Sequence, residues 1–133
     1  NKEKIKKKDL IIMHMTENVL LSKSKNFALL CIEFYQLLQK EGEYVISKQF
    51  LRSATSIGAN IHEAVSGQSK KDFYAKICIA FKEANETMYW IGLLKESSIT
   101  SLNTHQLEED CQEIIKMLAS TKMTTERNLG YQK

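Results

Sequence analysis

Hydrophobic residues recur at intervals of three and four along four segments of the 133-residue chain. These intervals keep the side chains on one side of a helix with 3.6 residues per turn, so each segment predicts an amphipathic helix. The first helix is expected to begin at Asn26, which suits an N-cap, and to end at Gly42. Its apolar stripe is Phe27, Leu30, Cys31, Phe34, Leu37 and Leu38.

The second and third helices follow after short polar stretches. The second is expected over residues 44–66, with Gly67 as its C-terminal stop, and its stripe is Ile46, Phe50, Ala54, Ile57, Ile61 and Ala64. The third is expected to open at Ser69, with Asp72 at the capping-box position, and to continue to Glu96. Its stripe is Phe73, Ile77, Ala80, Ala84, Met88 and Ile91.

A fourth helix is indicated by Leu107, Cys111, Ile114, Ile115 and Leu118. Four amphipathic helices with short connections bury their stripes best against one another, so the sequence predicts an all-α fold: an up-down-up-down antiparallel four-helix bundle. The domain is expected over residues 16–120. Residues 1–15 are expected to be a basic, disordered leader, and residues 121–133 a polar tail.

Composition narrows the class of protein. A hydrophobic content of 43% with 26% charged residues is typical of a soluble protein, and no apolar run approaches the roughly 20 residues that span a bilayer, so a membrane partner is excluded. Cys31, Cys78 and Cys111 lack metal-ligand spacing and fall on or beside apolar stripes, which favours inert thiols in a cytoplasmic protein. Most of the net charge of +3 comes from residues 1–25.

The third helix carries a second apolar face, well away from its core stripe. Its members are Ala75, Ile79, Trp90 and Leu93. A helix that is apolar on two faces must be covered on both, and a single bundle covers one, so this face predicts a homo-oligomer interface. The alternative is that a loop or tail of the same chain covers Trp90.

The stretch RSATSIGANIHEA in the second helix is rich in small and hydroxylated residues. Ser53, Ser56, Asn60 and Glu63 line up beside the apolar stripe, while Arg52 lies further toward the outside. Small side chains allow another helix to approach closely, and Ser hydroxyls can bond to carbonyls of their own helix. The pattern therefore favours helix packing and assembly over an active site.

The second and third predicted helices resemble a known protein family. FLRSATSIGANIHEA, followed by SGQSKKDFYAKICIAFKEANETMYWIGLL, resembles the four-helix bundle family of proteins encoded in intervening sequences of bacterial large-subunit ribosomal RNA genes. The likeness spans Met15 to Leu118, and only His62 departs from the family's usual small apolar residue. The family motif falls on Arg52, Ser53, Ser56, Ile57, Ala59, Asn60, Glu63, Glu83 and Glu86.

The resemblance implies an assembly and two candidate functions. Relatives form rings of five, which implies a homopentamer. A related branch, the accessory proteins of diversity-generating retroelements, binds nucleic acid and a reverse transcriptase through a positive surface. We therefore expect RNA or DNA binding, assisted by the basic leader, with Lys48, Arg52, Lys70 and Lys71 as the contacts. The alternative is a protein adaptor or scaffold ring without nucleic-acid contact.

The candidate chemistry is sparse. His14, His62 and His105 lie in different elements, and Glu83 and Glu86 lack the Glu-x-x-His pattern of bundle metal sites, so we expect no metal and no cofactor. The chain has no glycine-rich phosphate loop and no nucleophile motif, so we expect no enzyme activity. The family acids are expected to pair with Arg52, Lys76 or Lys82, or to accept hydrogen bonds from Ser and Asn at a helix contact; these acids are Glu63, Glu83 and Glu86.

Overall fold

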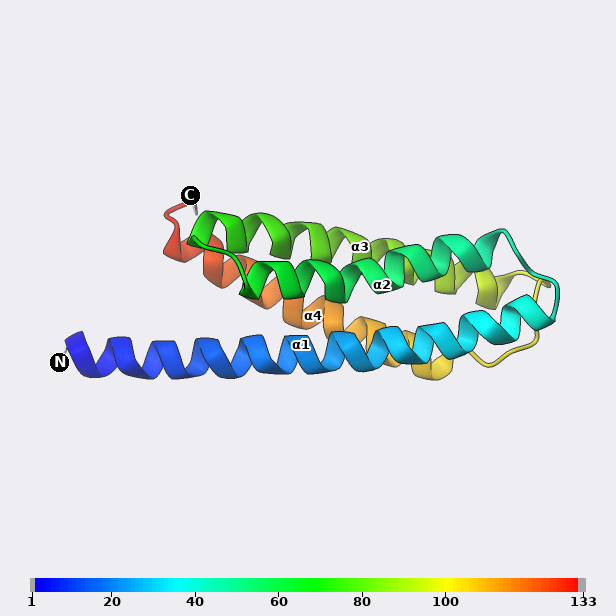
Figure 1. Ribbon diagram of the computed structural model, residues 1–133, viewed down its shortest axis with the longest axis horizontal. Coiled ribbons are helices and arrows are strands. Elements are labelled where there is room, and N and C mark those ends of the chain that lie inside the picture. The colour runs from blue at the N-terminus through cyan, green and yellow to red at the C-terminus, as the bar shows by residue number, and fades with distance from the viewer. Residues whose placement is uncertain (1, 132–133) are drawn as a thin grey trace.

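The computed structural model describes residues 2–131 and the side chains of residues 6–131. Four helices follow one another: α1 (Lys2–Lys40), α2 (Ile46–Val65), α3 (Lys70–Glu96) and α4 (His105–Asn128). They run alternately up and down, and α1 contacts both α2 and α4, which closes the bundle (Figure 1). The predicted all-α four-helix fold is confirmed.

The core forms where the apolar stripes of the four helices meet. Phe27, Phe50, Ile77 and Leu118 are among its fully buried side chains, and the rings of Phe34 and Phe50 meet edge to face with centroids 5.9 Å apart. The buried stripe of α3 differs from the predicted one, because it continues through Thr87 and Leu94 instead of Met88. Its intervals alternate between three and four, the 3.5-residue repeat that keeps a helix face directed toward a bundle core.

The N-terminal part of α1 differs from the expectation. Residues 2–15 are helical where a disordered leader was expected, and Asn26 lies inside the helix instead of capping it. Residues 1–41 contain no Gly or Pro, and Lys, Leu, Met and Glu favour helix, so nothing stops the helix before its first turn. Leu20 is also buried, which shows that the core stripe begins before Asn26.

The C-terminal end also differs, since α4 continues to Asn128 through the expected polar tail. Thr125 is buried on the bundle side, and the hydroxyl of Tyr74 donates to the carboxylate of Glu126 at 2.7 Å. These contacts hold a segment that has few apolar residues. The helix ends in a Schellman motif, in which Gly130 has φ 76° and the N–H of Tyr131 donates to the Glu126 carbonyl at 2.9 Å.

Short, capped turns fix the alternation of α1, α2 and α3. Gly42 has φ 86° and ends α1 as predicted, with the Glu43 N–H donating to the Leu38 carbonyl at 2.9 Å. Ser69 caps α3 as predicted, because its hydroxyl accepts from the Asp72 N–H at 3.1 Å. At both turns the local sequence is sufficient to place the end of the helix.

The cap of α2 was not predicted. The carboxylate of Glu43 accepts from the N–H groups of Val45, Ile46 and Ser47 at 3.2, 3.0 and 2.6 Å. Burial raises the pKa of Glu43, but these hydrogen bonds outweigh it and hold the pKa below its usual value. The ionised carboxylate therefore stabilises the first turn of α2.

We predict that Glu43→Gln lowers the free energy of unfolding at neutral pH by about 1 kcal/mol, the usual contribution of a helix cap. A folded-state pKa below the unfolded value means that this stabilisation is complete above the unfolded pKa and is lost as pH falls through the folded one. Urea denaturation should therefore show the two proteins converging in acid. Glu33→Gln, at an exposed position of α1, is the control, and an equal effect of both substitutions would contradict the capping role.

Candidate nucleic-acid interface

The family motif residues lie along the contact between α2 and α3. Ser53 is buried, and its Oγ lies 2.9 Å from Oγ1 of Thr87, which is buried on α3. Each hydroxyl also bonds within its own helix, Ser53 to the Phe50 carbonyl at 3.1 Å and Thr87 to the Glu83 carbonyl at 2.8 Å. Two small hydroxylated residues thus let the backbones approach without leaving a buried polar atom unpaired.

Sequence reasoning missed Thr87 because a single Thr among apolar residues gives little signal. The 3.5-residue spacing from Ala80 and Ala84 to Ile91 places position 87 on the core stripe, and that spacing is the signal that could have found it. The partner of Ser53 could then have been sought among the hydroxyl residues of the facing helix.

Arg52 connects α2 to α3 by ion pairs. Its Nη1 lies 3.4 Å from Oε2 of Glu83, and its Nη2 contacts Oε2 of Glu86. Further along the same contact, Nζ of Lys76 lies 3.0 Å from Oε2 of Glu63. The family acids therefore pair with basic residues across the helix contact, as expected for Arg52 and Lys76, whereas Lys82 takes no part in these pairs.

The other small residues of the stretch act within α2 or toward α1. Ser56 donates to the Arg52 carbonyl and Asn60 donates to the Ser56 carbonyl, each at 2.8 Å, while Ile57 is fully buried in the core. The close approach to a second helix is made by Gly58: a Cβ there would lie 3.3 Å from the hydroxyl of Ser24 on α1. The polar row is thus helix-packing chemistry.

We predict that Arg52→Glu lowers the free energy of unfolding by on the order of 1 kcal/mol, because it replaces two partly exposed ion pairs with like-charge contacts to Glu83 and Glu86. Chemical denaturation measures the change. Lys48→Glu is the matched control, since Lys48 is exposed on the same helix and belongs to none of the ion pairs in the described part of the chain. Equal stabilities of the Arg52→Glu protein and the wild type would contradict the bridging role.

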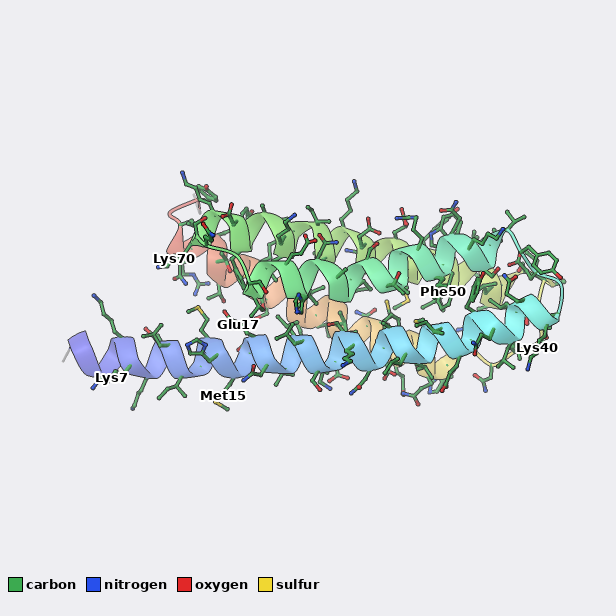
Figure 2. All side chains as sticks on the ribbon, in the orientation of Figure 1. Lys7, Met15, Glu17, Lys40, Phe50 and Lys70 are labelled. Carbon is green, nitrogen blue, oxygen red and sulfur yellow. The ribbon has the colours of Figure 1, made fainter. Side chains whose placement is uncertain are left out.

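The structure does not bring the four predicted nucleic-acid contacts together. Lys48 lies in the first turn of α2, whereas Lys70 and Lys71 begin α3 at the opposite end of the bundle (Figure 2). The 17 residues from Lys48 to the end of α2 correspond to about 26 Å of helix. Arg52 is already bound by two carboxylates. Lys48 and Arg52 are one turn apart on α2 and exposed, but Arg52 is in ion pairs, so only Lys70 and Lys71 of the four form an exposed adjacent pair outside the described ion pairs.

A larger charge pattern appears when the bundle is divided across its long axis. The dividing plane passes close to two contacts between neighbouring helices, Gly58 with Ser24 and Thr87 with Ser53. One half contains the N-terminal end of α1, the turn between α2 and α3, and the end of α4, all at the left in Figure 1. The other half contains the turn between α1 and α2 and the loop between α3 and α4.

These halves carry opposite net charge. We call residues 6–26, 56–82 and 117–131 the basic half, which holds eleven Lys and Arg side chains against five Asp and Glu. Residues 27–55 and 83–116 form the acidic half, which holds five against ten. An overall charge near zero for the described side chains thus conceals a strong separation along the axis of the bundle.

The basic half presents its lysines to solvent. Seven exposed lysines of the basic half belong to none of the ion pairs that the structure describes: Lys6, Lys7, Lys8, Lys25, Lys70, Lys71 and Lys82. Four of them come from α1 and three from α3. Lys6, Lys7 and Lys8 lie toward the same end of the bundle as the first turn of α3, which holds Lys70 and Lys71 (Figure 2).

The predicted second apolar face of α3 is divided. Trp90 is half-buried and packs against the core of its own chain, with the ring of Tyr89 edge to face at 5.2 Å. Its indole Nε1 is buried without a hydrogen-bond partner among the described residues. Ala75 and Ile79 are exposed, and Leu93 is half-buried. The interface remains a prediction that now depends chiefly on Ala75 and Ile79.

The thiols occupy interior positions. Cys31 and Cys111 are fully buried and Cys78 is half-buried. Burial, reinforced by the neighbouring Cys111 and Asp110, raises the pKa of Cys31, and burial together with Asp110 raises the pKa of Cys111 to about 12. Since the thiolate is the reactive form, the two buried thiols are poor nucleophiles at neutral pH.

Within residues 2–131, no helix has the length and apolar character needed to cross a bilayer. Over the described side chains, no group of three or more His, Cys, Asp or Glu is arranged to hold a metal ion.

Comparison with known proteins identifies the bundle. A family model described as 23S rRNA-intervening sequence protein matches residues 16–120. The chain belongs to this family. A crystal structure of a protein with unknown function, from the S23 ribosomal protein family of Bacteroides thetaiotaomicron VPI-5482, is 44% identical with a TM-score of 0.74, and covers 81% of this chain and 98% of that one. Among curated proteins, none matches this member of the 23S rRNA-intervening sequence protein family.

Proposed function

We propose that this protein binds the phosphate backbone of nucleic acid through the basic half of its bundle. The observation that supports the proposal is the separation of charge along the axis, which leaves seven exposed lysines of the basic half outside the ion pairs of the described residues. Lysine contacts to phosphate release counterions and carry little sequence information, so the binding is salt-dependent and largely indifferent to sequence. Membership of the 23S rRNA-intervening sequence protein family agrees with an RNA ligand.

The geometry favours a contact along the end of the bundle. Lys70 and Lys71 lie in the first turn of α3, where the helix dipole adds a partial positive charge. Lys6, Lys7 and Lys8 follow one another on α1 and point in different directions, since successive helix residues differ by about 100°. A phosphate backbone passing between α1 and the start of α3 therefore meets lysines from both helices.

Self-association is the second part of the proposal. Ala75 and Ile79 are exposed on α3, and apolar side chains at such positions are stabilised when a second copy covers them. The resemblance stated above implies five copies. In a cyclic ring whose axis runs along the bundles, every copy has the same orientation, and all basic halves then lie on one face. A modest charge per chain thereby becomes a strong local potential for phosphates.

We predict that the protein shifts both a structured RNA and a single-stranded DNA in an electrophoretic mobility assay. The affinity should fall by about tenfold or more when the salt concentration is raised from about 50 to about 200 mM, because several phosphate contacts are involved. Lys70→Glu combined with Lys71→Glu should weaken binding by about tenfold or more at low salt.

Lys48→Glu is the control for that experiment, because it also replaces an exposed lysine with glutamate, but in the acidic half of the bundle. It should leave binding within about twofold of the wild type. The absence of a shift with either nucleic acid would refute phosphate binding and favour the adaptor function. An equal loss from Lys48→Glu would show that the basic half is not the binding surface.

We predict that Ile79→Lys reduces the particle mass of the protein in sedimentation or light scattering. A buried lysine at a contact between copies is strongly unfavourable, whereas Ile79 is 41% exposed in a single chain, so the melting temperature of the bundle should change little. A wild-type mass equal to one 15.3 kDa chain at micromolar concentration would contradict self-association.

A further inference from the structure

The core stripe of α1 continues beyond the end of the bundle. From Leu38 back to Leu20 its positions alternate at intervals of four and three, and each side chain is buried or nearly so. The same intervals continue through Glu17, Met13, Leu10 and Lys6 without a break. The full series is Lys6, Leu10, Met13, Glu17, Leu20, Ser24, Phe27, Cys31, Phe34 and Leu38.

The N-terminal part of this stripe has no covering helix in its own chain. In Figure 1, α1 projects past the ends of the other three helices, and Figure 2 shows Lys7 on the projecting part. Leu10 is 49% exposed and Met13 39% exposed, although they occupy the same face as the buried Leu20. Leu10 and Met13 also precede residue 16, where the family match begins. The projecting segment thus has the spacing of the core stripe, but no other helix of the chain covers its apolar residues.

The order of residues on this face is self-complementary when two copies run antiparallel. A seven-residue helix repeat places its core residues at the first and fourth positions, and antiparallel helices pair a first position of one with a fourth position of the other. The intervals make Leu10 and Glu17 first positions. Met13 and Lys6 are fourth positions. When Leu10 of one copy meets Met13 of the next, the two-fold axis also places Lys6 opposite Glu17.

Other arrangements match charges poorly. A parallel pair places Lys6 against Lys6 and Glu17 against Glu17, two like-charge contacts. Shifting the antiparallel pair by one heptad places Leu10 against Lys6 or Met13 against Glu17, which buries a charge beside an apolar side chain. One register therefore satisfies both apolar positions and both charged positions at once.

We propose that residues 6–17 of α1 form an antiparallel, two-fold contact with the same segment of a second copy. Two Leu10–Met13 layers form its centre, and two Lys6–Glu17 ion pairs flank them. The carboxylate of Glu17 lies 3.7 Å from Nδ1 of His14, whose side chain is 68% exposed, and the Glu17 side chain is 17% exposed. The contact is separate from the Ile79 surface on α3 and needs no nucleic acid.

The contact of a single pair is weak. Twelve residues of helix are about 18 Å long and bury far less than the roughly 800 Å² per partner of a standard stable interface. The basic halves of the two copies also repel one another across the junction. Association is therefore expected at high micromolar concentration, and it becomes tighter if several segments of a larger assembly pair together.

The test is an exchange of charges, followed by sedimentation equilibrium from low to high micromolar concentration. The wild type should reach twice the particle mass that it has at low concentration. Lys6→Glu and Glu17→Lys should each raise the dissociation constant by about tenfold or more, because each creates two like-charge contacts. The combined variant Lys6→Glu, Glu17→Lys should restore the wild-type dissociation constant within about threefold, because opposite charges meet again.

Lys8→Glu is the matched control for Lys6→Glu, since position 8 lies on the opposite side of the helix from the proposed face and makes the same charge change. Melting temperatures within a few degrees of the wild type would show that Glu17→Lys leaves the bundle folded. A wild type that keeps its low-concentration mass throughout would overturn the proposal. Failure of the combined variant to recover, or an equal loss from Lys8→Glu, would overturn the antiparallel register. Each result is independent of the nucleic-acid assay and of Ile79→Lys.

Discussion

The contact between α2 and α3 is the constraint on which the rest of the structure depends. Ser53 and Thr87 allow close approach because both are small and the Thr87 hydroxyl donates to the Ser53 hydroxyl. Arg52 adds ion pairs to Glu83 and Glu86 at the edge of the same contact. Together they fix the longitudinal register of two long helices. A shift of one turn, about 5.4 Å, would separate the hydroxyl pair and both ion pairs.

The register of α2 against α3 and the capped turns determine where the charged residues of the sequence lie in the bundle. The turn between α2 and α3 is short and capped by Ser69, so the lysines at the start of α3 must lie at the end of the bundle where α2 finishes. Because α1 runs antiparallel to α2, its N-terminal lysines reach the same end. The acids at the start of α4 lie at the other end, beside the C-terminus of α3, where Lys95 pairs with Glu108 at 3.1 Å.

Sequence periodicity predicted the four helices and most of the core, because burial on one face leaves a repeat that local reading can detect. It did not predict the extent of α1, because three consecutive lysines and an Asp precede an apolar run of only four residues, and such a segment resembles a disordered leader. Arg52 was expected among the partners of the family acids, but the sequence did not specify which base meets which carboxylate, because that depends on the register of α2 against α3. Charge separation along the axis becomes visible only when the topology is known.

The two proposed contacts of the basic half are linked energetically. Antiparallel pairing of α1 segments brings two sets of lysines to one junction, and their mutual repulsion opposes the apolar layers of Leu10 and Met13. A polyanion lying across that junction neutralises both sets, so it favours the paired state over the unpaired one. Thermodynamic reciprocity then requires that pairing strengthen the binding of the polyanion by the same factor. Without a polyanion, repulsion between the lysines disfavours pairing of the two copies. A bound phosphate backbone removes that repulsion and so promotes assembly, and because the helix contact is weak, the assembly is reversible.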